Sequence, residues 1–175
     1  MNRTALLWVG LLASLTLLSG CAAGPDLKGQ PFFTAVEQAQ PEQATLYFYR
    51  PAASVGYFVT PTITINGNAV GVLPSGGFFR TTVPAGSYRI ESTTPPFVSS
   101  SVNKRFDLNV ESGHVYFIAD ETSSRAFSDD HALGEVNDAY YSGAHFYFRY
   151  ALVPAEEALR TIKWCQQVPA PVSKI

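Results

Sequence analysis

The sequence predicts a mainly β protein: an antiparallel β-sandwich of seven or eight strands that ends in one short helix. Three observations lead to this fold class. Short segments of alternating apolar and polar residues recur from residue 44 onward, and such alternation is typical of half-buried strands. Turns rich in glycine, proline and asparagine separate these segments, and no helical periodicity interrupts them before residue 154. Many short strands with frequent turns are characteristic of an antiparallel sandwich.

The first predicted strand covers residues 45–50. It stops at Pro51, which has no backbone N–H to donate to a sheet. A hairpin follows, in which two isoleucines alternate with polar residues before Asn66-Gly67 and two valines resume the alternation after it. Asn-Gly between alternating segments is the strongest short-range hairpin signal.

Five further strands follow from the same alternation, and turn signals such as Pro84-Ala85-Gly86 and Glu111-Ser112-Gly113 lie between them. These predicted strands cover residues 77–83, 87–93, 105–110, 115–119 and 144–153. One face of each is apolar and the other is mixed, as the two faces of a sandwich sheet require.

A short helix is predicted after Pro154, which suits the first turn of a helix. Its apolar residues have helical spacing, acidic residues occupy the first turn and Lys163 lies near the end, which matches the helix dipole. The predicted apolar stripe is Ala155, Ala158, Leu159 and Ile162. Cys165 continues this stripe, so we expect a buried thiol; the alternative is an intermolecular disulfide. Residues 166–175 are expected to form a loose tail.

Three segments carry a resemblance to a known family. They are Tyr47-Phe48-Tyr49-Arg50-Pro51, the isoleucine hairpin with Val70-Gly71-Val72-Leu73, and Val83-Pro84-Ala85-Gly86-Ser87-Tyr88. The pattern resembles a bacterial lipoprotein domain of unknown function, over about residues 44–165. Its centre resembles PEGA and transthyretin-like sandwich modules, within the broader immunoglobulin-like architecture. The resemblance implies a fold and implies no catalytic residues.

The first 21 residues have the features of an export signal. Arg3 precedes an apolar run over residues 5–18, and Leu18-Ser19-Gly20-Cys21 ends it. This ending resembles the lipobox of bacterial lipoproteins, which implies a diacylglycerol on the Cys21 sulfur and cleavage before Cys21. The alternatives are a transmembrane helix or a buried core helix. A transmembrane helix needs about 20 apolar residues, more than this run contains, and Gly20 and Cys21 end the run abruptly. Ala22, rather than aspartate, favours the outer membrane by the same resemblance.

The predicted organisation is therefore a signal peptide at 1–20, a lipidated tether at 21–43, a sandwich domain with its helix at 44–165, and a tail at 166–175. The tether is expected because residues 22–43 combine proline, glycine and glutamine with little periodicity. Phe32 and Phe33 interrupt it and are candidates for docking on the domain.

Charge excludes one class of partner. Cleavage removes Arg3 from the 12 basic residues, which leaves 11 against 14 acidic ones. A mildly acidic domain is a poor nucleic-acid binder, and it has no polybasic segment for an anionic membrane. Membrane attachment would rest on the lipid at Cys21.

No residue pattern points to catalysis. Asp129, Asp130 and His131 could hold a metal, but their spacing matches no established metal motif. No Gly-x-Ser-x-Gly elbow is present. We therefore expect a protein that is not an enzyme, with no cofactor and no metal.

Two features could form an interaction surface. Several tyrosines share strand faces with polar residues or flank a long connection, and on an outer face they could bind a glycan, a peptide or a protein. They are Tyr47, Tyr49, Tyr116, Tyr147, Tyr140 and Tyr141. Simple sheet packing is the competing explanation. The second feature is the segment 120–143, which has few strand or helix signals and is either a recognition loop or a tolerated insertion.

The leading functional hypothesis is a lipid-anchored, non-enzymatic binding module of the cell envelope, on the outer membrane facing the periplasm. One alternative is the outer-membrane anchor subunit of a secretion or envelope assembly. A second is an envelope enzyme or metal binder that uses residues 129–131.

Overall fold

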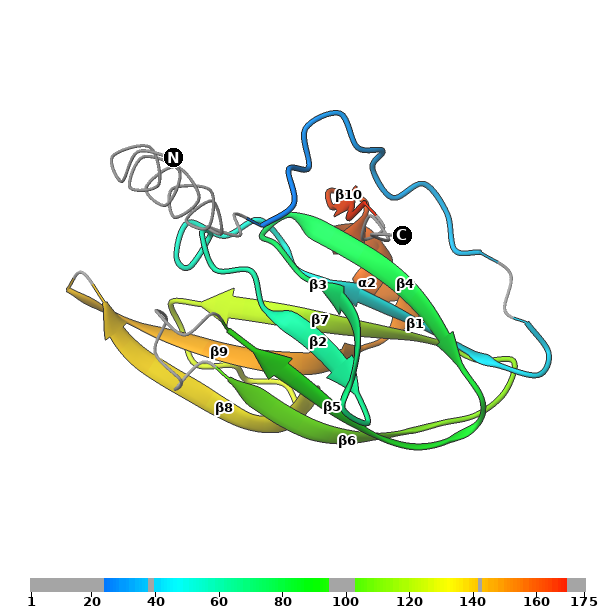
Figure 1. Cartoon of the computed structure of the whole chain (residues 1–175). Coiled ribbons are helices and arrows are strands. Elements are labelled where there is room, and N and C mark those ends of the chain that lie inside the picture. The colour runs from blue at the N-terminus through cyan, green and yellow to red at the C-terminus, as the bar shows by residue number, and fades with distance from the viewer. Residues whose placement is uncertain (1–23, 38–39, 95–102, 142, 170–175) are drawn as a thin grey trace, which may run out of the picture.

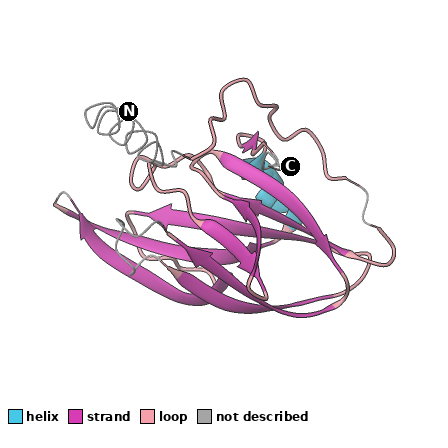
Figure 2. Ribbon diagram, viewed as in Figure 1, coloured by secondary structure: helices cyan, strands magenta, loops and turns pink. Residues whose placement is uncertain are grey.

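The computed structural model describes residues 24–37, 40–94, 103–141 and 143–169. Within them the chain forms two β-sheets and a short helix (Figures 1 and 2). The larger sheet has the order β10 (Gln166–Gln167), β4 (Gly77–Val83), β1 (Ala44–Tyr49), β7 (Val115–Ser123), β9 (Ala144–Val153) and β8 (Ala132–Tyr141). The smaller sheet has the order β3 (Asn68–Val72), β2 (Thr62–Ile65), β5 (Gly86–Thr93) and β6 (Lys104–Val110). The helix is α2 (Ala155–Ile162).

The predicted fold class is confirmed: the protein is mainly β, with a two-sheet sandwich and a C-terminal helix. The described residues hold ten strands rather than seven or eight. The additional strands are β8 and β10, which lie at the two edges of the larger sheet. Most pairs are antiparallel, but β1 runs parallel to β7 and β10 runs parallel to β4. The larger sheet is therefore mixed.

The main core lies between the two sheets. Leu46 and Phe48 of β1 pack there against inward-facing residues of β2, β5 and β6, and Phe48 stacks on Phe79 with ring centroids 5.1 Å apart. The inward-facing members from the smaller sheet are Ile63, Ile65, Ile90, Phe106 and Leu108, all buried. Burial of side chains of this size contributes about 1.5–3 kcal/mol each, which makes this layer the chief source of stability.

A second core covers the opposite face of the larger sheet. Ala158 and Ile162 of α2, together with Phe33 from the N-terminal segment, pack on Tyr47, Phe117 and other outward residues of β1 and β7. Figure 1 shows α2 on the far side of the larger sheet from the smaller one. Every residue of β1 is consequently buried. The buried stripe of α2 is narrower than the predicted one, because Ala155 and Leu159 are exposed.

The segment predicted as a tether is largely attached to the domain. Phe33 is buried, and its N–H donates to the Cys165 carbonyl at 3.0 Å. The Gln166 side-chain amide donates to the Leu27 and Gln30 carbonyls at 2.9 and 3.0 Å. The Gln167 N–H donates to the Pro31 carbonyl at 2.8 Å. Residues 27–33 of the predicted tether are thus held against the domain by the Gln166 side chain and by backbone bonds to Gln167 and Cys165. The expected docking is confirmed for Phe33, whereas Phe32 is exposed.

The predicted tail is also partly ordered, because Gln166 and Gln167 form β10 and Val168 is buried. Residues 170–175 and the whole predicted signal peptide, with Cys21, lie outside the described residues.

The segment 120–143 is mostly strand, so the expectation of a long loop is wrong. β7 continues to Ser123 and β8 begins at Ala132, which leaves a connection of eight residues. The pairing of β8 with β9 shifts register between Leu133 and Asn137. Gly134 lies in this irregular stretch with φ +80°, and a Cβ there would approach the Arg105 carbonyl to 2.9 Å. The irregularity hid the strand periodicity and brings β8 against β6.

Candidate functional site

Two of the predicted surface tyrosines are in the core. Tyr47 and Tyr49 are each 2% exposed, and Tyr47 stacks on Phe117 with centroids 5.3 Å apart. Burial raises the pKa of Tyr49 above its usual range. Their assignment to an interaction surface is therefore wrong. The outward side of β1 looked polar in sequence, but α2 and Phe33 cover it.

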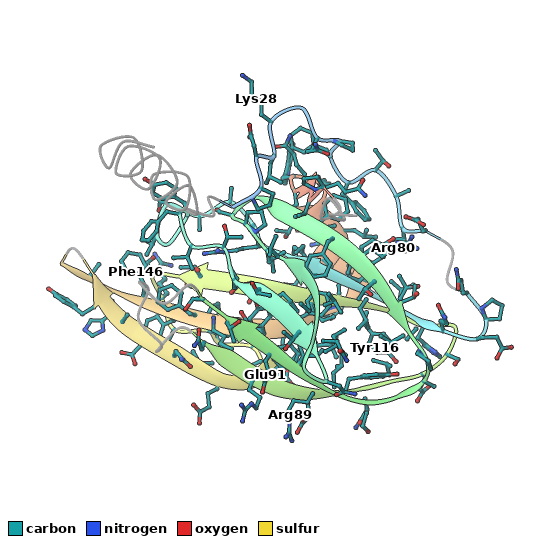
Figure 3. All side chains as sticks on the ribbon, viewed as in Figure 1. Lys28, Arg80, Arg89, Glu91, Tyr116 and Phe146 are labelled. Atoms are coloured by element: carbon teal, nitrogen blue, oxygen red, sulfur yellow. The ribbon has the colours of Figure 1, made fainter. Side chains whose placement is uncertain are left out.

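The remaining tyrosines do not form one surface. Tyr116 is half-buried beside the β6–β7 turn, where its hydroxyl accepts from the Glu111 N–H at 2.9 Å (Figure 3). Tyr140 and Tyr147 lie on the β8–β9 hairpin. Tyr140 is 68% exposed and its ring meets the His145 ring edge to face, whereas Tyr147 is half-buried. The backbone of Tyr141 pairs with Ala144, and its side chain is outside the described part of the chain.

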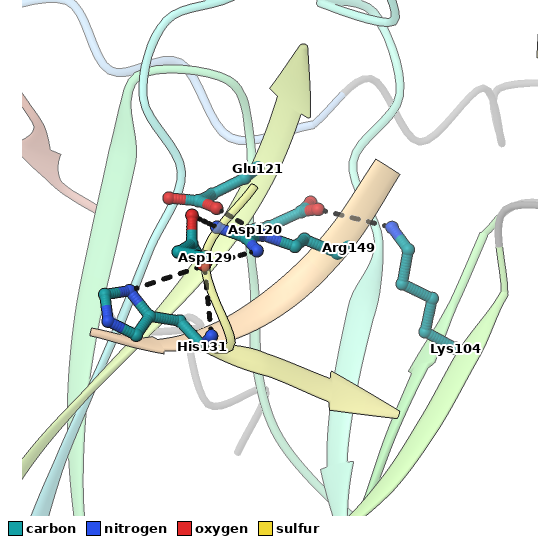
Figure 4. A network of polar contacts seen from close by, with 6 residues as sticks. All are labelled: Lys104, Asp120, Glu121, Asp129, His131 and Arg149. Carbon is teal, nitrogen blue, oxygen red and sulfur yellow. Dashed lines mark hydrogen bonds and ion pairs between the residues drawn. The ribbon is translucent and has the colours of Figure 1, made fainter. Parts of the chain in front are cut away.

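Asp129 belongs to a cluster that we call the rim cluster: Arg149, Glu121 and Asp129 (Figure 4). Arg149 donates from both terminal nitrogens to the two Asp129 oxygens at 2.6 and 2.8 Å and from Nε to Glu121 at 2.7 Å. Its guanidinium also lies 3.8 Å from the Phe127 ring centroid. Hydrogen bonding by Arg149 lowers the pKa of Asp129 to about 2.

This arrangement bears on the metal hypothesis for residues 129–131. Both Asp129 oxygens already accept from Arg149, so a cation there would have to displace a bidentate ion pair. His131 lies 3.6 Å from Asp129 through Nδ1. Among the described residues no group of three or more histidine, cysteine or acidic side chains is arranged to hold a metal.

A second cluster, the inner cluster, consists of Arg50, Lys104 and Asp120. Asp120 lies between the two cations, with Arg50 Nε at 3.4 Å and Lys104 Nζ at 3.5 Å, and all three side chains are under a tenth exposed. Asp120 and Glu121 are adjacent on β7, and because strand residues alternate in direction they serve clusters on opposite faces of the sheet. Desolvation lowers the pKa of Lys104, although Asp120 opposes this shift.

The inner cluster borders a small cavity of about 90 Å³, which includes Ser92 and Phe148 in its wall. The Ser92 hydroxyl accepts from the Tyr150 hydroxyl at 3.0 Å. The wall of this cavity is mostly apolar, and the charged atoms of the inner cluster lie at its border. Sequence reasoning missed this cluster, because its three residues are distant in sequence: Arg50 follows β1, Lys104 begins β6 and Asp120 lies in β7.

A second concave feature, much larger than this cavity, is an apolar groove of about 970 Å³ at the open side of the sandwich. Val70 and Val72 of β3 form one wall, Phe78 and Phe79 of β4 form the other, and residues 31–37 border it. Arg80 pairs with Glu37 at 2.8 Å beside it. The volume is at the upper end of the range for small-molecule sites, roughly 300–1,000 Å³.

Cys165 is the buried residue that the sequence predicted. It is fully buried, unpaired, and 3.6 Å from the Arg50 carbonyl. Burial raises its pKa to about 12, so the thiolate that disulfide formation requires is strongly disfavoured. No helix in the described residues is both long enough and apolar enough to span a bilayer.

The fold and these clusters define a β-sandwich domain with a helix-covered sheet and an open apolar groove. The chain belongs to a family of proteins of unknown function, DUF2846, whose sequence profile matches residues 40–132. The match runs from before β1 to the first residue of β8, so it includes the groove strands and the whole inner cluster, and it excludes Arg149 and α2. Searches of curated proteins and of solved structures give no match.

Proposed function

We propose that this protein is a lipid-anchored, non-enzymatic lipoprotein of the cell envelope, and that its sandwich is a binding module. The observation that carries the anchoring is Leu18-Ser19-Gly20-Cys21 directly after an apolar run. Two or more acyl chains on Cys21 would hold the protein firmly, since each buried CH₂ contributes about 0.8 kcal/mol. Ala22 supports sorting to the outer membrane, with the domain in the periplasm.

The apolar groove supports the binding role. It is formed mainly by side chains of β3, β4 and residues 31–37, and it remains open between the edges of the two sheets. The charged residues support a role without catalysis, because Arg50, Asp120 and Arg149 are engaged in ion pairs within the fold. The two-sheet arrangement also supports the resemblance to PEGA and transthyretin-like modules.

Acylation is tested by growing cells with an alkyne analogue of palmitate and isolating the protein. We expect label on the wild-type chain and on Cys165→Ala, and none on Cys21→Ala. We also expect Cys21→Ala to retain residues 1–20 and the other two to lose them. Label that persists in Cys21→Ala would contradict the proposed anchor.

The binding role is tested by photo-crosslinking in intact cells. A photoreactive amino acid replaces Val72 in the groove or, as a control, Asn109 on the outer face of β6, which is exposed. We expect a recurrent crosslinked product from position 72 alone. Identical products from both positions would contradict the groove as the binding site.

A further inference from the structure

The connection between β1 and β2 presents two adjacent aromatic side chains to solvent. Tyr57 and Phe58 are 65% and 61% exposed and meet edge to face, with centroids 5.7 Å apart. Contiguous exposed apolar patches mark contact surfaces, whereas singly exposed apolar residues are ordinary.

The tip of this connection has a defined conformation. The Val59 N–H donates to the Gly56 carbonyl at 2.9 Å, which places Tyr57 and Phe58 at the two central positions of a turn. Arg50 donates to the carbonyls of Val59 and Gly56 at 2.6 and 3.0 Å. Because Arg50 is itself held by Asp120, the inner cluster fixes the turn and the aromatic pair is presented on an ordered support.

The connection is also free of charge. Residues 51–61 contain no acidic or basic residue, and neither do residues 22–25. Charged side chains are costly at apolar depth, whereas aromatic rings are enriched at the boundary between headgroups and acyl chains. The composition of this surface therefore suits a lipid interface.

The aromatic pair lies on the same side of the domain as the point where the lipid would enter. Gly24 packs on Thr60, so closely that a Cβ on Gly24 would lie 2.3 Å from the Thr60 Oγ1. In Figure 1 the described chain begins next to the β1–β2 connection. Cys21 precedes Gly24 by three residues, a reach of at most about 11 Å. Residues 27–33 are attached to β10, so they provide no further slack.

We propose that the turn bearing Tyr57 and Phe58 enters the interfacial region of the membrane that carries the lipid of Cys21. This inference rests on the proposed anchor and adds a second contact to it. One lipid attachment leaves a domain free to rotate about it. An aromatic turn beside the attachment point limits that rotation and gives the domain one orientation on the bilayer surface.

The test places a single tryptophan in the full-length chain. In a Trp8→Phe and Trp164→Phe background, tryptophan replaces Phe58, Tyr57 or, as a control, Arg89, which lies exposed on the outer face of β5 (Figure 3). Each protein is isolated from cell membranes and returned to phosphatidylethanolamine and phosphatidylglycerol vesicles with brominated acyl chains. Circular dichroism confirms folding, and mass spectrometry of the Cys21 peptide reports acylation.

We expect acylated Phe58→Trp to be quenched about threefold more strongly than Arg89→Trp, because interfacial side chains lie roughly 5–10 Å below the headgroup surface. Tyr57→Trp should behave like Phe58→Trp. Equal quenching at positions 57, 58 and 89 in acylated protein overturns this inference and leaves the proposed anchor standing. The turn would then contact a protein partner instead of the membrane. An unmodified Cys21 overturns both.

Discussion

The inner and rim clusters use the same kinds of charged residues under opposite conditions. The inner cluster places two cations around one carboxylate, between the sheets, at 3.4 and 3.5 Å. The rim cluster places two carboxylates around one guanidinium at 2.6–2.8 Å, with Asp129 39% exposed. The first has imperfect geometry and full desolvation, and the second has bidentate geometry and partial solvent access.

The difference shows that the ion pairs that stabilise the fold need not be the ones that hold a surface turn in position. The free-energy cost of removing charges from water exceeds the attraction within a buried ion pair unless every polar atom has a partner. Arg50 Nε makes no hydrogen bond within the described residues, so the inner cluster does not meet this condition. The inner cluster instead orders the connection that carries Tyr57 and Phe58. The rim cluster joins the 124–131 connection to β9, and the buried Arg149 is compensated there by three hydrogen bonds to two partly exposed carboxylates.

Among substitutions that test this contrast, we expect Asp120→Asn to have the largest effect on stability. Loss of the shared carboxylate leaves two buried cations facing each other, so we expect a loss of about 3–5 kcal/mol in the free energy of unfolding. Urea denaturation at neutral pH measures it. Glu121→Gln, one residue away on β7, is the matched control and should cost clearly less, because Arg149 keeps Asp129. Equal losses would contradict the distinction between the clusters.

Asp129→Asn should cost about 1 kcal/mol at pH 7, since solvent reduces the value of a partly exposed pair. The pKa of Asp129 falls from 3.8 to about 2 on folding, so its contribution is complete above pH 3.8 and disappears as the pH falls toward 2. The difference between wild type and variant should narrow over that range. Asp130→Asn should leave stability unchanged; a constant difference across this pH range would contradict the prediction.

The smallest effect is expected for Lys104→Met. Burial lowers the pKa of Lys104 below its ordinary value of 10.5, so the folded state binds this proton less tightly than the unfolded chain does. Removal of the charge should leave stability unchanged or raise it by up to about 1 kcal/mol at pH 7. Any gain should shrink as the pH approaches 10.5, where the unfolded lysine is also neutral. A clear loss would show that the Lys104–Asp120 pair is net stabilising.

Local patterns sufficed for the regular parts of the fold. The alternation over 77–83 and 144–153 gave the bounds of β4 and β9, and Asn66-Gly67 marked the β2–β3 turn. These elements follow from period-two patterning and turn chemistry, which are visible in one segment at a time. β8 was missed because its irregular register around Gly134 breaks that period.

The features that depend on distant pairing could not be predicted. Tyr47 and Tyr49 were expected at the surface because their own strand does not reveal what covers its second face. The inner cluster joins Arg50, Lys104 and Asp120, each of which is unremarkable in its own segment. The turn at Tyr57 and Phe58 could not be predicted either, since it is marked only by its exposure and by the packing of Gly24 on the nearby Thr60.

From the attachment of residues 27–33 to β10 we expect a particular response of the protein to mechanical load. Tension applied at the N-terminal side reaches the hydrogen bonds from Gln166 and Gln167 of the edge strand β10 before it reaches the inner strands of either sheet. Released one after another, these bonds would free a length of chain while the sandwich stayed intact. An envelope under strain would then lengthen the connection between anchor and domain without unfolding the domain.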